Sequence, residues 1–173
     1  MRSTLFIAVL LHWYAFSQKT GTFDDHIGLE KVFKEYIKAI DSKKMDSIVK
    51  FFDHNDCTFH FGENKPIVIK SKEELLDLFS SWINSPKSLY VSTKLEELNV
   101  VPVWDDVDTK LCTVDATYSR IGNGGAALGR GRSLYHFYRE KYEYPYRLLK
   151  KWKEWKLYMI SDLAIEDRIK FSD

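Results

Sequence analysis

The side chains best suited to chemistry are a histidine, a tyrosine and an aspartate on three separate segments. His60 could act as a general base, because an unperturbed histidine has a pKa of about 6.5, close to neutral pH. Tyr36 lies on an apolar helical face, from which its hydroxyl could donate into a water-poor pocket. Asp115 lies on the polar face of a predicted strand and could pair with His60 if that face lines a pocket. Each residue also has a structural interpretation: a core aromatic, a histidine in a pocket wall and a solvated aspartate.

Several motifs that would define a metal or cofactor site are incomplete. The histidines show no H-x-x-x-H spacing and the chain has no C-x-x-C motif, so no metal site is predicted. Asp105, Asp106 and Asp108 lack the glycine and the terminal glutamate of a calcium loop. The run Gly122-x-Gly124-x-x-Ala127 lies between two predicted strands and opens no helix, which excludes a dinucleotide fingerprint. The sequence therefore predicts no cofactor.

The first residues have the three parts of a secretory signal peptide. Arg2 supplies the positive region, residues 5–11 form an apolar run too short for a bilayer, and Ala15-Phe16-Ser17 is a small-x-small cleavage site. We expect a signal peptide at 1–17, a flexible terminus at 18–24 and one secreted domain at 25–168. A buried N-terminal strand or an uncleaved anchor is the alternative. No transmembrane segment is expected after residue 17.

The composition describes one folded domain with balanced charge. The chain has 173 residues, of which 15% are aromatic, and disordered chains lack such residues. Its 26 basic and 25 acidic residues give a net charge of +1, which excludes nucleic-acid binding as a default function. Cys57 and Cys112 allow at most one disulfide, and we expect them not to bond, since their strands need not be neighbours.

Hydrophobic periodicity and turn signals predict helices first and a long run of strands afterwards. Ser71 and Glu74 form a capping box, and Pro86 should end the helix that follows. The predicted helices cover 25–40, 44–52 and the segment from 71 to Pro86, and the predicted strands cover 57–61, 67–69, 88–104, 111–121, 128–140 and 152–165. The segment 141–151 fits either a strand or a helical turn. This order predicts an α+β fold with three helices packed on one face of an antiparallel sheet.

Five segments carry a resemblance to a known superfamily. They are Val32–Ile40, Met45–Phe52, Cys57–Gly62, Ser71–Leu75 and Trp155–Leu157. The order resembles the nuclear transport factor 2-like superfamily, which includes ketosteroid isomerase, scytalone dehydratase and SnoaL-like cyclases. The resemblance covers about residues 25–167. It implies a cone-shaped, cystatin-like α+β barrel with a small-ligand pocket at its open mouth.

The resemblance also implies roles for individual residues. In isomerase-like members a first-helix tyrosine holds the oxyanion and a first-strand carboxylate is the base; an ungapped comparison places Tyr36 and His60 at these positions. The missing carboxylate argues against ketosteroid isomerisation. The implied ligand-binding residues are Phe33, Tyr36, Ile37, His60, Phe79, Trp82 and Asp115.

Three functions follow as hypotheses. The leading one is a secreted, non-catalytic carrier or sensor of a small hydrophobic ligand. The second is an isomerase-, dehydratase- or cyclase-type enzyme with His60 as base and Tyr36 as oxyanion donor. The third is a homodimeric interaction module in which the pocket is closed and the outer sheet face binds a partner. We expect a homodimer under the leading hypothesis too: if His60 faces the pocket, Phe59 and Phe61 face outward and form an interface. The basic aromatic segment 147–156 could bind a polyanion, or it could be the solvated face of a hairpin.

Overall fold

The computed structural model describes residues 22–62, 64–85, 88–144 and 147–163. The predicted signal peptide at 1–17, most of the terminus at 18–24 and the predicted end of the domain lie outside the described residues. None of the described helices is long and apolar enough to cross a membrane.

Three helices form where the sequence predicts them. They are α2 (Thr22–Asp41), α3 (Met45–Val49) and α4 (Lys72–Ile83). Helix α2 begins three residues earlier than expected, and its apolar face is buried at Leu29, Phe33 and Tyr36. The capping box of α4 is present, because the backbone N–H of Glu74 donates to Ser71 Oγ at 3.1 Å. Helix α4 ends at Ile83, before the expected stop at Pro86.

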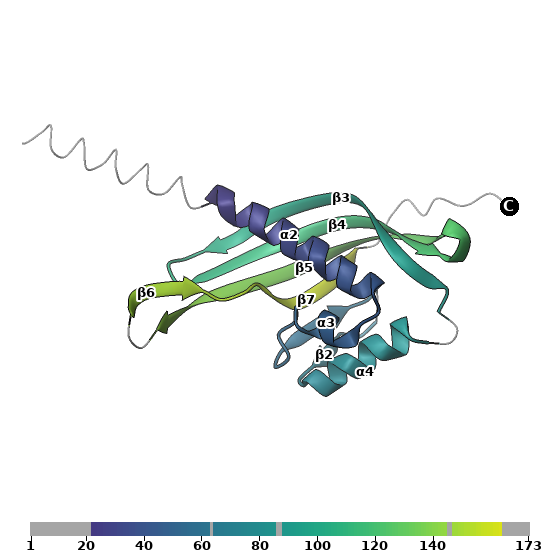
Figure 1. Cartoon of the computed structure of the whole chain (residues 1–173), viewed down its shortest axis with the longest axis horizontal. Helices are drawn as coiled ribbons and strands as arrows, with labels where there is room; N and C mark the ends of the chain where they lie inside the picture. Colours follow the sequence, from purple (N-terminus) through teal and green to yellow (C-terminus); the bar gives the residue numbers. More distant parts are fainter. Residues whose placement is uncertain (1–21, 63, 86–87, 145–146, 164–173) are drawn as a thin grey trace, which may run out of the picture.

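The strands form one mixed sheet (Figure 1). They are β1 (Cys57–His60), β2 (Ile67–Ile69), β3 (Tyr90–Asp105), β4 (Thr109–Gly122), β5 (Ala127–Tyr144), β6 (Arg147–Trp152) and β7 (Lys156–Leu163). Their order is β2-β1-β7-β5-β4-β3, and β6 pairs with the end of β5. The expectation of an antiparallel sheet is wrong at one place, because β1 runs parallel to β7, with Phe59 opposite Ile160.

The ambiguous segment 141–151 is strand. Strand β5 continues to Tyr144 and β6 returns beside it, with Lys141 opposite Trp152. The expected single last strand at 152–165 is therefore two elements, because Trp152 ends β6 and β7 begins at Lys156.

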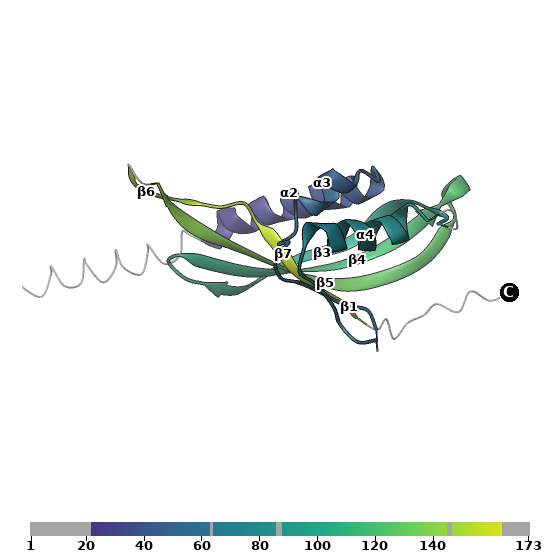
Figure 2. The same cartoon turned by 90° about the horizontal axis from the view of Figure 1, so that it is seen from below.

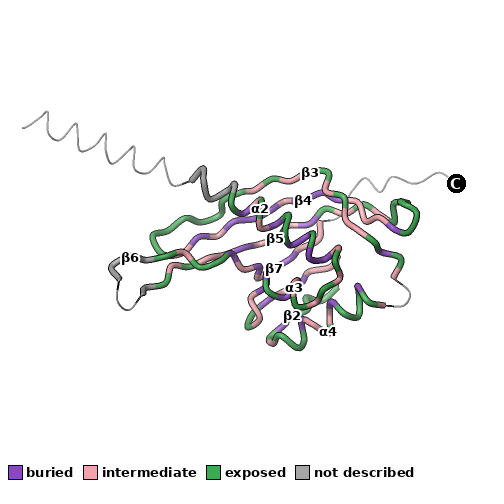
Figure 3. Tube along the Cα trace, in the orientation of Figure 1, coloured by how far each residue is buried: buried purple, intermediate pink, exposed green. Residues whose placement is uncertain are grey.

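All three helices lie on one face of the curved sheet, which does not close into a barrel (Figure 2). The alternation predicted for β4 is confirmed: Cys112, Val114 and Ala116 are buried toward the helices. Buried positions are concentrated along the parts of the strands that lie beside the helices, and the β3–β4 and β4–β5 turns are exposed (Figure 3). The sheet thus has an inner face toward the helices and an outer face on which none of the described helices lies.

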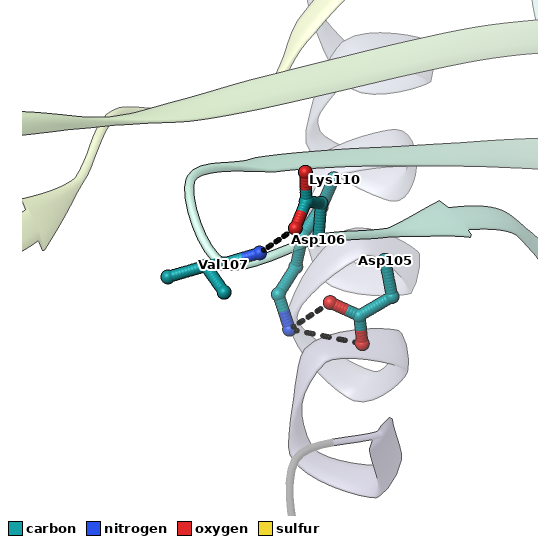
Figure 4. Close-up of polar contacts among 4 residues, drawn as sticks. All are labelled: Asp105, Asp106, Val107 and Lys110. Atoms are coloured by element: carbon teal, nitrogen blue, oxygen red, sulfur yellow. Dashed lines mark hydrogen bonds and ion pairs between the residues drawn. The ribbon is translucent and has the colours of Figure 1, made fainter.

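The turns contain the residue types that their geometry requires. In the β4–β5 turn, Gly124 has a φ of +74° and Gly125 a φ of +83°, the region that glycine adopts without steric cost. In the β3–β4 turn, Lys110 Nζ lies 3.2 Å from Asp105 Oδ1, and the backbone N–H of Val107 donates to Asp106 Oδ1 at 2.6 Å (Figure 4). A lysine and a backbone amide therefore satisfy two of the acidic side chains in this turn.

The two cysteines are not joined to each other. Both are buried, Cys57 on β1 and Cys112 on β4, and β7 and β5 lie between these strands. Burial, with the nearby Asp53 and Asp56, raises the pKa of the Cys57 thiol to about 12. The expectation that the cysteines do not bond is confirmed, and Cys57 stays protonated at neutral pH.

Candidate functional site

An apolar cavity of about 420 Å³ lies between the helices and the inner face of the sheet. We call it the inner chamber. Helix α2 contributes Tyr36, Ile37 and Ile40, and α4 contributes Leu78, Phe79 and Trp82. The strands contribute Phe59, Thr93, Tyr118, Arg120, Tyr135, Ile160 and Asp162, and Phe61 and Ile67 complete the lining. A volume above about 300 Å³ with few polar groups is typical of a small-molecule site.

A second cavity of about 1010 Å³ adjoins the inner chamber, and we call it the outer chamber. The two chambers share four lining residues, Trp82, Tyr118, Arg120 and Asp162. Serines, glycines and arginines make up most of the lining of the outer chamber, and Ser81 of α4 is one of them. The outer chamber, which is the more polar of the two, therefore adjoins the apolar inner one at these four shared side chains.

A chain of hydrogen bonds ends at the carboxylate of Asp162. Ser133 Oγ donates to Asp162 Oδ1 at 2.6 Å, and Tyr118 Oη lies 3.0 Å from Ser133 Oγ. Because a serine hydroxyl has one proton, Ser133 must accept from Tyr118 while it donates to Asp162. Asp162 keeps further acceptor positions toward the chambers that it lines. The wall thus presents a carboxylate that can accept a hydrogen bond from a bound molecule.

The position of Tyr118 depends on a missing side chain opposite it. Gly131 on β5 pairs with Tyr118, and a Cβ at that glycine would lie 2.9 Å from the tyrosine ring and its hydroxyl oxygen. Contacts below 3.0 Å essentially never occur for a real Cβ atom, so only glycine allows the ring to lie here. Gly131 therefore helps to place the Tyr118 hydroxyl beside Ser133.

Tyr36 lies in the inner chamber, where the resemblance implied. It is 3% exposed, and Phe51, Phe52 and Tyr135 surround its ring at centroid distances of 5.7 to 6.0 Å. Burial raises the pKa of its hydroxyl well above the ordinary value of 10.0. Tyr36 is therefore protonated at neutral pH and can act as a hydrogen-bond donor.

His60 lies on the outer face, away from the inner chamber. Phe59 is 1% exposed and Phe61 partly buried, and both line the chamber, so the alternation of β1 turns His60 to the other side. Its electrostatic neighbour there is His136. His60 and Tyr36 therefore do not share a cavity, and the predicted orientation of β1 is wrong. The argument for an interface made by Phe59 and Phe61 also fails.

Two other predicted ligand-binding residues lie elsewhere. Asp115 is on the outer face, where Arg132 Nη2 and Nε bind its carboxylate at 2.6 and 2.9 Å and hold its pKa below the ordinary value. Phe33 is completely buried behind the chamber, with its ring centroid 4.8 Å from that of Tyr135. The residues brought together as predicted are Tyr36, Ile37, Phe79 and Trp82.

On the outer face, His136 should make stability depend on pH. Burial first, and then the nearby His60, lower the pKa of His136 below its ordinary value. Below pH 6.5 or so the unfolded chain takes up this proton more readily than the folded chain, so acidification favours unfolding. At higher pH both states are neutral and the effect vanishes. Urea unfolding at about pH 7.5 and 5.5 should show a smaller difference for His136→Gln than for wild type; an equal difference would contradict this expectation.

The basic aromatic segment is only partly within the described side chains, which exclude those of Arg147 and Lys150. Trp152 packs under three cations of neighbouring strands, with Lys141 Nζ 4.5 Å from its ring centroid and Arg139 and Lys110 at 4.8 and 5.1 Å. The Trp152 ring is thus used within the fold. Polyanion binding at 147–156 stays a prediction.

Three polar residues that line both chambers, Asp162, Tyr118 and Arg120, are not among the predicted site residues. Asp162 lies two residues after the buried Ile160 and therefore on the same face of its strand. This spacing is the sequence signal that places Asp162 on the inner face. Tyr118 and Arg120 continue the inward alternation of Val114 and Ala116 on β4. Alternation along β4 predicts which side chains face inward, but it does not predict that the last of them line a ligand cavity. No three of the described His, Cys, Asp and Glu side chains gather in a group that could hold a metal ion.

Comparison with known proteins identifies the class of fold. No protein-family model matches the sequence, and no curated protein matches it at a significant level. The described chain has the nuclear transport factor 2-like fold, also called cystatin-like, as the sequence predicts.

Three solved structures illustrate the likeness. A protein of unknown function with a cystatin-like fold from Nostoc punctiforme has a TM-score of 0.56 at 12% identity, over 82% of this chain and 91% of that one. A provisionally named scytalone dehydratase from Novosphingobium aromaticivorans has a TM-score of 0.56 at 10% identity, over 80% and 82%. A provisionally named dehydratase of the NTF2-like family from Streptomyces avermitilis has a TM-score of 0.52 at 10% identity, over 80% and 96%. At such identities the likeness concerns the fold alone.

Proposed function

We propose that this protein binds a small, mainly apolar ligand in the inner chamber, without catalysing a reaction on it. The observation that carries the proposal is a chamber of about 420 Å³ with an apolar lining that adjoins the outer chamber at four polar or aromatic side chains. A flat ligand can stack among the rings of Tyr36, Phe59 and Phe79. A hydroxyl or N–H group of the ligand can donate to Asp162, which already holds one donor from Ser133. The signal-peptide pattern at 1–17 supports the further proposal that the protein works outside the cell.

The test uses a neutral fluorescent probe and a variant that fills the chamber. N-phenyl-1-naphthylamine should bind the wild-type protein with enhanced fluorescence. Leu78→Trp places an indole in the chamber from α4, at a partly buried position, and should weaken probe binding by about tenfold or more. Leu76→Trp is the matched control, because Leu76 is equally a partly buried residue of α4 but does not line the chamber.

Two results would overturn this proposal. If the wild-type protein did not bind the probe, the chamber would not accept a small apolar molecule as proposed. Equal binding by wild type, Leu78→Trp and Leu76→Trp would show that the probe binds somewhere else. A ligand recovered by mass spectrometry from the natively secreted protein would identify the natural class directly.

An enzyme is the second candidate, with residues different from those first expected. The carboxylate of Asp162 and the hydroxyl of Tyr36 line the same chamber, and this pairing of a base with a donor suits proton abstraction or dehydration. Two of the similar structures carry provisional dehydratase names, which is consistent with this candidate. Conversion of the recovered ligand by wild type, and its loss in Asp162→Asn, would favour the enzyme over the carrier.

Self-association through the outer face is a separate proposal. It is supported by apolar side chains on the outer face: Leu134, Tyr158 and Met159 are partly exposed, and Val68 is 46% exposed. Sedimentation of the purified protein measures this property independently of ligand binding.

A further inference from the structure

Arg120 is a cation at the junction of the two chambers. It lines both of them, and its guanidinium carbon lies 4.8 Å from the Trp82 ring centroid and 5.8 Å from that of Tyr118. At these distances both rings make cation–π contacts with the guanidinium, and no hydrogen bond joins its N–H groups to either residue. The charge also reaches into the inner chamber, where it acts to lower the pKa of Tyr36 against the stronger effect of burial.

Arg120 differs from the other arginines of the chamber walls. Arg130 Nε binds Glu96 at 2.6 Å, and Arg132 binds Asp115 through two nitrogens. Among the described residues, no carboxylate lies within ion-pair distance of Arg120. A half-buried guanidinium beside two rings, with no hydrogen bond or ion pair to another described residue, is suited to an oxyanion.

We propose that Arg120 binds the carboxylate of an amphipathic acid whose apolar body occupies the inner chamber. This inference rests on the proposed function and names the chemical class of its ligand. A carboxylate matches the planar fork of a guanidinium, which can give it two parallel hydrogen bonds. The apolar lining of the inner chamber accepts the rest of the molecule.

Asp162 should not repel the bound carboxylate, because Asp162 lies at another part of the chamber wall. Asp162 pairs with Ser133, which lies opposite Ala116, four residues along β4 from Arg120. At about 3.3 Å per residue, that separation is about 13 Å along the strand. An acid can therefore place its carboxylate at Arg120 and a hydroxyl group, if it has one, near Asp162.

The test compares an acid with an alcohol of the same length. Decanoate and 1-decanol each displace bound N-phenyl-1-naphthylamine at about pH 7.5, where the acid is ionised. In Arg120→Met the inhibition constant of decanoate should rise by about tenfold or more, and that of decanol should change by less than about threefold. Arg120→Lys, which keeps the charge but loses the planar fork, should show an intermediate loss.

Lys94→Met is the matched control. Lys94 is exposed and follows Thr93, the partner of Arg120 on β3, so the variant removes one cation from the opposite face of the same strand pair. It should leave both inhibition constants unchanged. Equal decanoate displacement from wild type, Arg120→Met and Lys94→Met would overturn the inference while leaving the proposed function intact, because the neutral probe would still bind.

A measurement on the wild-type protein alone covers the case in which Arg120→Met does not fold. Raising the salt concentration from about 0.05 to about 0.5 M should weaken decanoate binding and leave decanol binding unchanged. The same salt response for both compounds would contradict an ionic contact. Failure of the neutral probe to bind at all would instead contradict the proposed function itself.

Discussion

Replacing Phe33 by alanine is expected to lower the free energy of unfolding by about 3–5 kcal/mol. The ring is completely buried and lies against three other aromatic rings, with centroid distances of 4.8 Å to Tyr135, 5.9 Å to Tyr36 and 6.5 Å to Phe137. Alanine would leave a void at the contact between α2 and β5. Because Tyr36 and Tyr135 also line the inner chamber, the variant should bind a neutral probe more weakly as well.

Urea unfolding followed by circular dichroism measures the stability change. Val103→Ala is the control, because Val103 is 59% exposed and its truncation should change the free energy by no more than about 0.5 kcal/mol. A loss for Phe33→Ala as small as that of the control would mean that α2 does not pack on the sheet as described.

The second large effect is expected at the end of α2. Asp41 Oδ1 accepts a hydrogen bond from the hydroxyl of Tyr90 and another from the backbone N–H of Thr93, at 3.0 Å for the latter. Asp41→Ala would leave both donors without this acceptor, and Tyr90 is only 5% exposed. We expect a loss of about 1–3 kcal/mol, because the Thr93 N–H then lacks an acceptor, while the Tyr90 hydroxyl keeps Thr93 Oγ1 at 2.6 Å as its partner. The damage should extend to the site, because Tyr90 stacks on Trp82.

Asp46→Ala is the control for Asp41→Ala. The Asp46 side chain is 92% exposed, and its nearest ionic partner, Lys72, is 3.8 Å away, so its removal should be nearly neutral. A double-mutant cycle with Tyr90→Phe separates the network from the single residues. Strictly additive losses in that cycle would contradict a hydrogen bond between Asp41 and Tyr90.

Much of the local structure can be predicted from the sequence, because short-range signals specify it. Ser71 and Glu74 mark the start of α4, and the glycines after Gly122 mark the β4–β5 turn. The inward face of β4 follows from alternation, because its other face is polar. The pairing of β1 with β7 has no such local signal, since it depends on the packing of distant segments.

The main error concerns which face of β1 is buried. The run from Cys57 to Phe61 alternates aromatic and polar residues, and either face could have lined the pocket. The ungapped likeness favoured His60, whereas burial of the much larger apolar surface of Phe59 and Phe61 favours the opposite orientation. A shift of one residue in a strand moves every side chain to the other face, so this one choice also misplaced the expected catalytic pair.

The parallel pairing of β1 with β7 has a consequence for how the chain folds. Phe59 and Ile160 are about 100 residues apart in the chain, and among the described strands β1 pairs with β7 and β2. Closing so long a loop is slow, whereas short turns join the strands of the β3–β4–β5 meander. During synthesis, β1 can therefore join the rest of the sheet only after β7 has left the ribosome. Phe59 and Ile160 become chamber wall only at that last step, so the capacity to bind a ligand should appear later than most of the secondary structure.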